Sequence, residues 1–528
     1  MNERRFERLA RAALAAVATA ACVAASYGAD PTAVEPAKMA RVGTVDERFQ
    51  SFNIEMVEVT GGRFWAPYNK PAAAAPQTAP PPRLSTPAMA ATMFRNRPPI
   101  DLANPRLRKL AAALGPAYVR VSGTWANSTY FQDSDQPAPA TPPAGFGGVL
   151  TRHEWRGVVD FSRAVDARLV TSFAISAGVR DAQGVWTPEQ AQKLFAYTRS
   201  IGGTIAAAEF FNEPTFAAVG GAPKGYDAAA YGRDFAVFHA FAKKAAPQMT
   251  ILGPGSIGEA ASLGPVAALL KSEDMLKAGG GAVDAFSYHF YGALSERCSV
   301  MPGAAQTTVA EALSDEWLSR TDRDEAFYAA LRDRFAPGKP IWLTETGEAA
   351  CGGNPWAADF IDSFRYLDQM GRLARRGVQV IAHNTLAASD YGLIDETTLA
   401  PRPNYWSALL WRRLMGTTVL DAGTAPAGLH LYAHCLRGHP GGVALLAINL
   451  DREKPRQLAT PLRSERYTLT ARDLLESSVE LNGRELRLGG SDALPEIAGV
   501  PAAVGPVTLA PASITFLAFP DAGNPSCR

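Results

Sequence analysis

Residues 206–214, AAAEFFNEP, begin the part of the sequence that decides the fold. They form a short β-rich run, and a helical pattern follows at residues 231–245. A second β-rich run, TILGPGS, comes next at residues 250–256. A strand, a helix and a strand in this order predict a βαβ unit, in which the two strands belong to one parallel sheet.

The same alternation extends over most of the chain. Further β-rich runs lie at residues 49–56, 117–123, 169–176, 285–292, 340–347 and 379–386. Helical patterns separate most of them, at residues 188–200, 266–278, 324–334 and 357–376. Eight strands with helices between them predict an α/β fold of the (β/α)₈ barrel type, which we place at residues 46–411.

The character of the sequence changes after Trp411. Short β-rich runs separated by turns follow at residues 429–435, 443–450, 467–472, 478–481, 507–509 and 513–519, and no helix of normal length fits between them. This pattern predicts a C-terminal all-β sandwich domain at residues 412–528, completed by residues 30–45. We therefore expect two packed domains.

The composition of the 528 residues is that of a globular protein, with 47% hydrophobic and 20% charged residues. The 52 basic side chains almost balance the 51 acidic ones. Nucleic-acid binding requires a concentrated basic surface, so this balance argues against a nucleic-acid partner.

Residues 1–29 have the pattern of a secretory signal peptide. Arginines precede the apolar run at residues 12–25, and Ala25, Gly28 and Ala29 offer cleavage points. The run is too short to span a bilayer, and no later stretch reaches the roughly 20 apolar residues that a span needs. We expect an exported protein, periplasmic or extracellular. Cys22 lacks the preceding Leu that is normal for a lipid-anchored cysteine, so we expect its removal with the signal.

Four cysteines remain after the signal peptide, namely Cys298, Cys351, Cys435 and Cys527. An even number in an exported chain suggests two disulfides, and four cysteines allow three pairings. Their spacing fits no zinc motif, and the chain has only seven histidines. The sequence therefore predicts no metal site and no cofactor.

Two glutamates stand where a barrel enzyme holds its reacting groups. Glu213, in Asn212-Glu213-Pro214, ends the fourth predicted strand, and Glu345 ends the seventh. The carboxyl ends of barrel strands meet at one rim, which can bring two carboxylates to the separation of about 5–5.5 Å found in retaining glycosidases. One carboxyl group would be protonated and the other ionised. Asn212 would donate a hydrogen bond to the sugar 2-hydroxyl.

Two other glutamates compete for these roles. Glu209 lies four residues before Glu213, so both would point to the same face of the predicted strand. Glu348 lies three residues beyond Glu345, in the following loop. Glu348 is therefore a rival nucleophile. We prefer Glu345 because it ends an apolar strand, where glutamate is disfavoured unless it has a specific role.

Two segments are unusually rich in proline, at residues 66–105 and 132–148. Flexible linkers have such a composition. In the predicted barrel, however, these segments follow the first and second strands, and such loops lie on the face that holds the active site. The sequence alone leaves both interpretations open.

A set of motifs covers most of the chain in a definite order and spacing. They are FQSFNIE (49–55), PAYVR (116–120), NEP (212–214), HFY (289–291), WLTET (342–346), DYGLIDE (390–396), AINL (447–450) and VELNG (479–483). This set resembles the heparanase-like β-glucuronidases of glycoside hydrolase family 79, which are retaining (β/α)₈ enzymes.

The resemblance implies roles for individual residues. Glu213 would be the acid/base and Glu345 the nucleophile. Tyr391 and the backbone amides of Cys351, Gly352 and Gly353 would hold the carboxylate of a uronic acid, because they donate hydrogen bonds without a full charge to desolvate. Further sugar contacts are implied for Glu55, where the family usually has Asp, and for Gly123, Thr124, Asn212, His289, Tyr291, His383 and Asn384.

The resemblance also implies a disulfide between Cys435 and Cys527. Cys298 and Cys351 are then left as a second pair, each of which follows a strand on the catalytic side. Such a pair would brace the turn that binds the carboxylate.

The implied function is that of a secreted β-glucuronidase with a glucuronic-acid-containing glycan or glycoside as its partner. Release of terminal glucuronic acid is favoured, since internal cleavage of a sulfated polymer requires a basic cleft and this chain is nearly neutral. Internal cleavage of heparan sulfate is the alternative. A same-clan enzyme for a neutral sugar is another hypothesis. A non-catalytic carbohydrate-binding protein is a third, against which the presence of both Glu213 and Glu345 argues.

Overall fold

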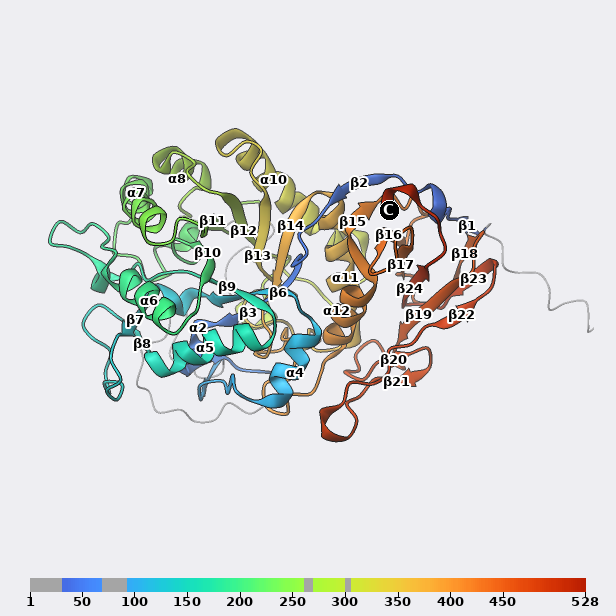
Figure 1. The fold of residues 1–528 in the computed structure, drawn as a ribbon, viewed down its shortest axis with the longest axis horizontal. Coiled ribbons are helices and arrows are strands. Elements are labelled where there is room, and N and C mark those ends of the chain that lie inside the picture. The colour runs from blue at the N-terminus through green and yellow to red at the C-terminus, as the bar shows by residue number, and fades with distance from the viewer. Residues whose placement is uncertain (1–30, 69–92, 261–268, 300–304) are drawn as a thin grey trace, which may run out of the picture.

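The computed structural model describes residues 31–68, 93–260, 269–299 and 305–528. The predicted signal peptide and part of the first proline-rich segment lie outside these residues. Figure 1 shows a barrel of strands with helices around it, beside a stack of strands that carries the C-terminus. No helix in the described ranges is both long and apolar enough to cross a membrane.

A closed parallel barrel forms the larger part of the molecule. Its strands are β3 (Gln50–Glu55), β6 (Ala117–Ser122), β9 (Ala167–Thr171), β10 (Ile205–Glu209), β11 (Thr250–Ser256), β12 (Ala285–Tyr291), β13 (Ile341–Gly347) and β14 (Val378–His383). Each strand pairs with the next one in chain order, and β14 closes the ring against β3. The predicted (β/α)₈ barrel is confirmed.

Helices follow the barrel strands and cover the outside of the barrel. They are α2 (Met56–Thr60), α4 (Pro105–Ala113), α5 (Arg152–Ala164), α6 (Glu189–Ser200), α7 (Ala228–Ala245), α8 (Ser272–Gly279), α9 (Asp315–Leu318), α10 (Arg320–Phe335), α11 (Phe360–Arg375) and α12 (Pro403–Leu414). Local capping sets some of the boundaries. The Asp227 side chain accepts a hydrogen bond from the Ala230 N–H, so α7 begins before the predicted residue 231.

The fourth barrel strand is shorter than predicted. β10 ends at Glu209, and the chain leaves the sheet before the 3₁₀ turn Pro214–Phe216. Glu213 has left-handed backbone angles, φ 49° and ψ 62°, which are costly for an L-residue. Asn212 and Glu213 therefore stand on a loop beyond the strand end, which directs the Glu213 side chain over the barrel mouth.

Two sheets form a β-sandwich beside the barrel. The larger sheet contains β2 (Arg41–Thr44), β15 (Met415–Leu420), β16 (Leu429–Leu436), β17 (Val443–Asn449), β19 (Ser464–Thr470), β20 (Glu480–Leu481), β21 (Arg484–Glu485), β22 (Val500–Ala502) and β24 (Ser513–Phe519). The smaller contains β1 (Thr32–Ala33), β18 (Arg456–Thr460) and β23 (Gly505–Leu509). Leu445, Leu458 and Leu517 belong to one buried cluster that joins the two sheets. The strands β15, β18, β21 and β22 lie outside the predicted runs.

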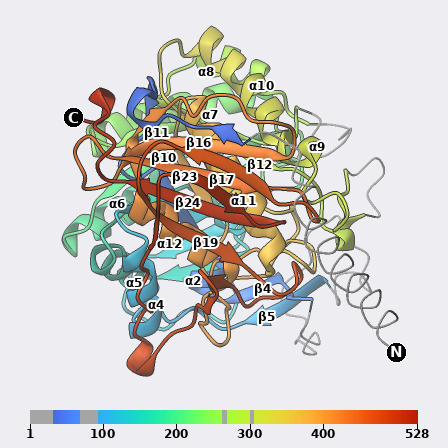
Figure 2. The same cartoon turned by 90° about the vertical axis from the view of Figure 1, so that its right-hand side faces the viewer.

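The sandwich packs directly against the barrel, and Figure 2 shows its strands crossing in front of the barrel helices. Gly371 of α11 lies against the Tyr432 ring of β16 so closely that a Cβ would be 2.2 Å from it. Tyr432 also donates a hydrogen bond of 2.6 Å to the Asp368 carboxylate. His430 lies between Asp368 and Asp315, which belong to different helices. Both apolar and charged contacts thus join the two domains.

Two disulfides are present. Cys435–Cys527 ties the final segment to β16 within the sandwich. Cys298–Cys351 joins the loop after β12 to the loop after β13. The second disulfide therefore lies on the side of the barrel that carries the strand ends.

The described parts of both proline-rich segments belong to the folded structure. In the first, β5 (Phe94–Arg97) pairs with β4 (Gly62–Trp65), while residues 69–92 lie outside the described residues. In the second, residues 132–148 connect β7 (Thr129–Gln132) to β8 (Gly148–Thr151), and these two strands pair in parallel. For the second segment, the linker interpretation is wrong.

Candidate active site

Arg120 stands at the centre of the candidate site, on β6. It is buried and donates hydrogen bonds to Glu209 at 2.8 and 3.0 Å, to Glu345 at 2.8 Å and to Asn212 at 2.7 Å. Burial lowers its pKa, but the Glu209 and Glu345 carboxylates outweigh burial and raise the pKa above its usual value. Arg120 therefore keeps its charge and holds three strand ends together. We did not predict it as a site residue, although an arginine in an apolar strand is itself a signal.

Glu209 acts as the counter-ion of Arg120. Its carboxylate is fully buried and also accepts a hydrogen bond of 2.6 Å from the Thr344 hydroxyl. Burial raises its pKa, but Arg120 and His289 lower it far more, so it stays ionised. A carboxylate engaged in this way is not free to act on a substrate.

Glu345 lies on β13, inside the strand as the structure defines it. Arg120 donates to its Oε2 at 2.8 Å, and the Tyr291 hydroxyl donates to its Oε1 at 2.9 Å. These two hydrogen bonds fix both oxygens of the carboxyl group in place. The side chain is 8% exposed, so it is reachable but shielded from bulk water.

Glu213 reaches the same place from the loop after β10. Its Oε1 lies 3.1 Å from His289 Nδ1, and its side chain is 17% exposed. Burial raises the pKa of Glu213, and the nearby Glu345 charge raises it further, against the lowering effect of His289. The raised pKa makes Glu213 suited to hold and deliver a proton.

Glu213, His289 and Glu345 form a compact cluster, in which one donor atom of each lies within 4.8 Å of the others. Three such atoms could hold a metal ion. However, Glu345 and the hydrogen-bonded Glu209 and Glu213 raise the pKa of His289 to about 9, against the effect of burial. The Arg120 guanidinium donates to Glu345 at 2.8 Å and lies 3.2 Å from His289 Nε2, so a full positive charge beside the cluster disfavours a metal cation there.

Asn384 contacts several polar side chains near Glu345. Its Nδ2 lies 2.9 Å from the Tyr291 hydroxyl, 3.1 Å from Glu55 Oε1 and 3.3 Å from the Tyr391 hydroxyl. Burial raises the pKa of Glu55 well above its usual value, and Glu345 adds to this effect. Gly123 has φ 93° and packs on the Glu55 carboxyl group, where a Cβ would be 1.6 Å from Oε2. The structure thus brings these predicted residues together.

Three predicted contact residues are placed differently from what we expected. His383 is buried, and its Nε2 bonds the Tyr391 backbone carbonyl at 2.7 Å, so it supports Tyr391 from behind. The Gly353 N–H donates to the Ala349 carbonyl at 3.1 Å and is not free to bind a carboxylate. Thr124 is exposed at the start of the 3₁₀ turn Thr124–Ser128.

The rival nucleophile Glu348 is engaged elsewhere. It is fully buried and accepts hydrogen bonds from the backbone N–H and side-chain amide of Asn354, at 2.8 and 3.0 Å. Burial raises its pKa to about 8, so it is mostly protonated at neutral pH. Glu348 therefore stabilises the loop that follows β13. It is not part of the cluster of Glu213, His289 and Glu345.

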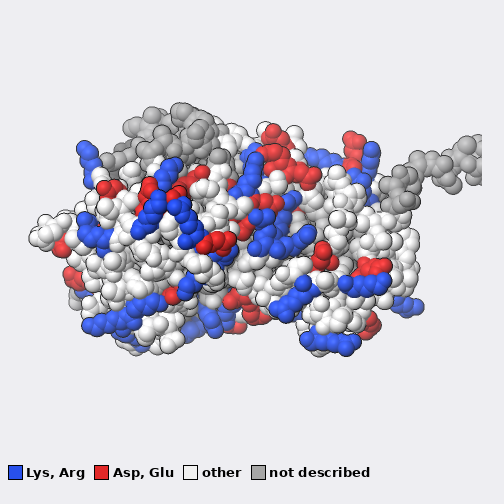
Figure 3. Space-filling model, turned by 90° about the horizontal axis from the view of Figure 1, so that it is seen from above, with Lys and Arg blue, Asp and Glu red and all other residues white. Residues whose placement is uncertain are grey.

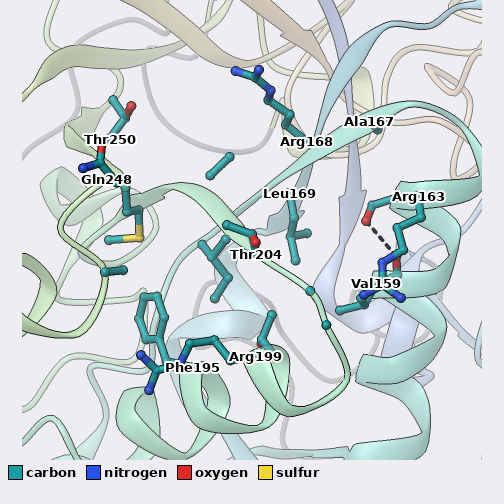
Figure 4. A pocket seen from close by; sticks show the side chains of 18 of the residues that line it. Val159, Arg163, Ala167, Arg168, Leu169, Phe195, Arg199, Thr204, Gln248 and Thr250 are labelled. Carbon is teal, nitrogen blue, oxygen red and sulfur yellow. Dashed lines mark hydrogen bonds between the residues drawn. The ribbon is translucent and has the colours of Figure 1, made fainter.

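A separate cavity of about 630 Å³ lies at the opposite end of the barrel, where β9, β10 and β11 begin (Figure 4). Arg163 and Arg199 on its wall belong to the last turns of α5 and α6. They donate hydrogen bonds to the backbone carbonyls of Ile201 and Ala245, at 2.8 and 3.0 Å. Such contacts are typical of helix C-termini, and the cavity contains none of the groups above.

The pKa values predict how stability depends on pH. His289 holds a proton in the folded state up to about pH 9, whereas its ordinary pKa is 6.5, so its contribution to stability is lost between these values. Glu348, with a pKa of about 8 against an ordinary 4.5, likewise makes folding less favourable as pH rises. We expect the thermal unfolding midpoint to fall between about pH 6 and pH 9. A midpoint that rises over this range would contradict both assignments.

Comparisons with known proteins agree with this geometry. The family model described as glycosyl hydrolase family 79, N-terminal domain, matches residues 95–371. Heparanase-like protein 1 of Arabidopsis thaliana is 27% identical over 81% of this chain and 86% of its own length. Heparanase of Rattus norvegicus is 30% identical over 73% of this chain and 80% of its own length.

A solved structure of lower identity has the same fold. The family 51 arabinofuranosidase of Xanthomonas axonopodis aligns with a TM-score of 0.58 and 18% identity, over 91% of this chain and 98% of that one. The family model spans the barrel strands β6 to β13 and includes Glu213 and Glu345. The chain therefore belongs to glycosyl hydrolase family 79 and is a glycoside hydrolase.

Proposed function

We propose that this enzyme hydrolyses β-glucuronides by a double displacement at Glu213 and Glu345. The observation that carries the proposal is that one carboxyl oxygen of Glu213 lies within 4.8 Å of one carboxyl oxygen of Glu345. Retaining enzymes hold them about 5–5.5 Å apart, whereas inverting enzymes need about 6.5–9.5 Å to admit a water molecule.

The two steps divide the work between the glutamates. In the first, Glu345 attacks the anomeric carbon while Glu213 gives its proton to the leaving oxygen, and the sugar becomes an ester of Glu345. In the second, Glu213 takes a proton from water, and the water oxygen displaces Glu345 from the anomeric carbon. The product keeps the β configuration.

The neighbours of the pair support this division. Arg120 and Tyr291 stabilise the Glu345 carboxylate before attack and again when it leaves the sugar. His289 lies 3.1 Å from Glu213 and 3.7 Å from Glu345, so it holds both in place. Asn212, whose Oδ1 accepts from Arg120, has its amide fixed beside the acid, where a sugar 2-hydroxyl would lie.

Three groups support a uronic acid as the substrate sugar. Tyr391 places its hydroxyl beside Asn384, and the backbone N–H groups of Cys351 and Gly352 have no protein acceptor within the described residues. Together they offer donors for a carboxylate. Glu55, which burial keeps protonated, is an additional donor for a sugar hydroxyl.

A Tyr391→Phe variant tests the choice of sugar. The hydroxyl is lost while the ring keeps its packing, so we expect the KM for 4-nitrophenyl β-glucuronide to rise about tenfold. Hydrolysis of the matching β-glucoside, which has no carboxylate, should change by less than about twofold. Equal loss on both substrates would argue for an enzyme that acts on a neutral sugar.

The enzyme is proposed to release terminal glucuronic acid. On the face shown in Figure 3, basic and acidic side chains of the described residues are interspersed, and such a mixture attracts a sulfated polymer less than a wholly basic surface would. In addition, Trp65 of β4 packs against Gly352. It therefore covers one side of the turn whose amides would bind the carboxylate. The relatives named heparanase make internal cleavage of heparan sulfate the second candidate. Product length from a defined heparan oligosaccharide separates the two, since only the terminal mode gives single glucuronic acid residues.

Export from the cytoplasm is also proposed. The Cys298–Cys351 and Cys435–Cys527 disulfides support it, because such bonds persist in oxidising compartments.

A further inference from the structure

We infer that the Cys298–Cys351 disulfide is a positioning device that sets the enzyme's affinity for the acidic sugar. This inference rests on the proposed function, since it concerns the turn that would bind the uronic carboxylate. The disulfide joins two loops whose own residues take no part in bond cleavage.

The two loops form one unit near the strand ends. The Ala350 N–H donates to the Ala293 carbonyl at 3.0 Å, and the Ser295 N–H donates to the Ala350 carbonyl at 2.9 Å. The Ser295 hydroxyl then donates to the Gly353 carbonyl at 2.7 Å. The loop after β12 therefore holds both ends of the turn 350–353, and the disulfide is attached between them.

The backbone of this turn is unusual. Cys351, Gly352 and Gly353 have φ values of 69°, 88° and 83°, all in the left-handed region. Glycine adopts these angles freely, but an L-residue such as cysteine does so only when its surroundings impose them. Trp65 lies against Gly352, where a Cβ would be 2.6 Å from the Trp65 Cβ, and the disulfide fixes Cys351. These two constraints fix the directions in which the Cys351 and Gly352 N–H groups point.

Cutting the disulfide removes the covalent constraint at the one residue that disfavours the turn. Cys351 is then free to return to negative φ, which would rotate its peptide groups and redirect the two amides. The reacting group is held independently, because Arg120 and Tyr291 position Glu345 through hydrogen bonds that do not involve the disulfide. Loss of the disulfide should therefore weaken binding much more than bond cleavage.

The test compares two variants that each break one disulfide and leave one free cysteine. Cys298→Ser releases the turn, and Cys527→Ser is the matched control in the sandwich. For Cys298→Ser, the KM for 4-nitrophenyl β-glucuronide should rise about tenfold while kcat changes by less than about twofold. Cys527→Ser should leave KM within about twofold of the parent, whatever its unfolding temperature. An unchanged KM in Cys298→Ser, or an equal rise in both variants, would overturn the inference.

A second variant keeps the disulfide and the cysteines. Ser295→Ala removes the hydroxyl that holds the Gly353 carbonyl, and it should raise KM about threefold with little change in kcat. If Cys298→Ser does not fold, the Cys527→Ser protein decides the matter, because Cys298–Cys351 is the disulfide it retains: reduction should raise its KM about tenfold, and a KM that reduction leaves unchanged contradicts the inference. The parent enzyme separates this inference from the proposed function. If the parent does not hydrolyse the glucuronide, the proposed function fails. If the parent is active and the variants keep its KM, only the inference fails.

Discussion

Replacing Glu345 by Gln is expected to lower kcat for 4-nitrophenyl β-glucuronide by a factor of about 10⁵. The amide keeps the size of the side chain, and its oxygen can still accept a hydrogen bond from Arg120. It cannot attack the anomeric carbon, however, so the first step has no nucleophile. Steady-state rates measured over hours, on protein free of parent enzyme, are sufficient to detect this loss.

The matched control for this variant is Glu348→Gln. Glu348 is three residues away, and glutamine keeps its size and one of its two hydrogen bonds from Asn354; the other is lost because an amide nitrogen cannot accept, which lowers stability without touching Glu345. Its hydrogen bonds with Asn354 are structural, and we expect kcat to stay within about threefold of the parent. A large loss in Glu348→Gln together with activity in Glu345→Gln would exchange the roles of the two residues.

The second large effect concerns Glu213→Ala and depends on the leaving group. An alkyl or sugar glucuronide needs a proton on its leaving oxygen, so kcat/KM for such substrates should fall by about 10³ or more. 2,4-Dinitrophenolate is a leaving group that needs no protonation. The first step on a 2,4-dinitrophenyl glucuronide should therefore remain fast. The sugar ester on Glu345 would then accumulate, since no base activates water. A burst of dinitrophenol followed by a slow steady state is the expected time course.

Added azide provides the control for this variant. Azide is a nucleophile that needs no general base, so it should restore the steady-state rate of Glu213→Ala on the dinitrophenyl substrate and release β-glucuronosyl azide. The parent enzyme should respond little, because its water is already activated. Equal losses on good and poor leaving groups, with no effect of azide, would remove Glu213 from the acid/base role.

The barrel could be predicted from sequence because its strands are buried on both faces and appear as nearly continuous apolar runs. The run at residues 250–256 coincides with β11. Strand ends on the catalytic side were less accurate, because Phe210 and Phe211 continue the apolar run while the backbone has already left the sheet at Glu209. In the sandwich, β15 was missed because it follows α12 without a turn.

The proximity of Glu213 and Glu345, the proposed reacting pair, could be predicted from their places near strand ends, but the side chains that surround them could not. Arg120 and Glu209 lie on different strands, and only the closed barrel brings them into contact. The identity of the free amides is another example, since the Gly353 N–H is occupied by a carbonyl within its own turn. Such distinctions depend on backbone angles and side-chain partners that no local sequence pattern specifies.

The measurement that tests the central claim most directly is the covalent labelling of the nucleophile. A 2-deoxy-2-fluoro-β-glucuronosyl fluoride loses fluoride on attack, and its fluorine at carbon 2 slows hydrolysis of the resulting ester. Peptide mapping of the inactivated enzyme should place a single added sugar on Glu345, and Glu345→Gln should remain unlabelled. A label on Glu348 or on any other carboxylate, or no label in an enzyme that still hydrolyses glucuronides, would contradict the mechanism proposed for this active site.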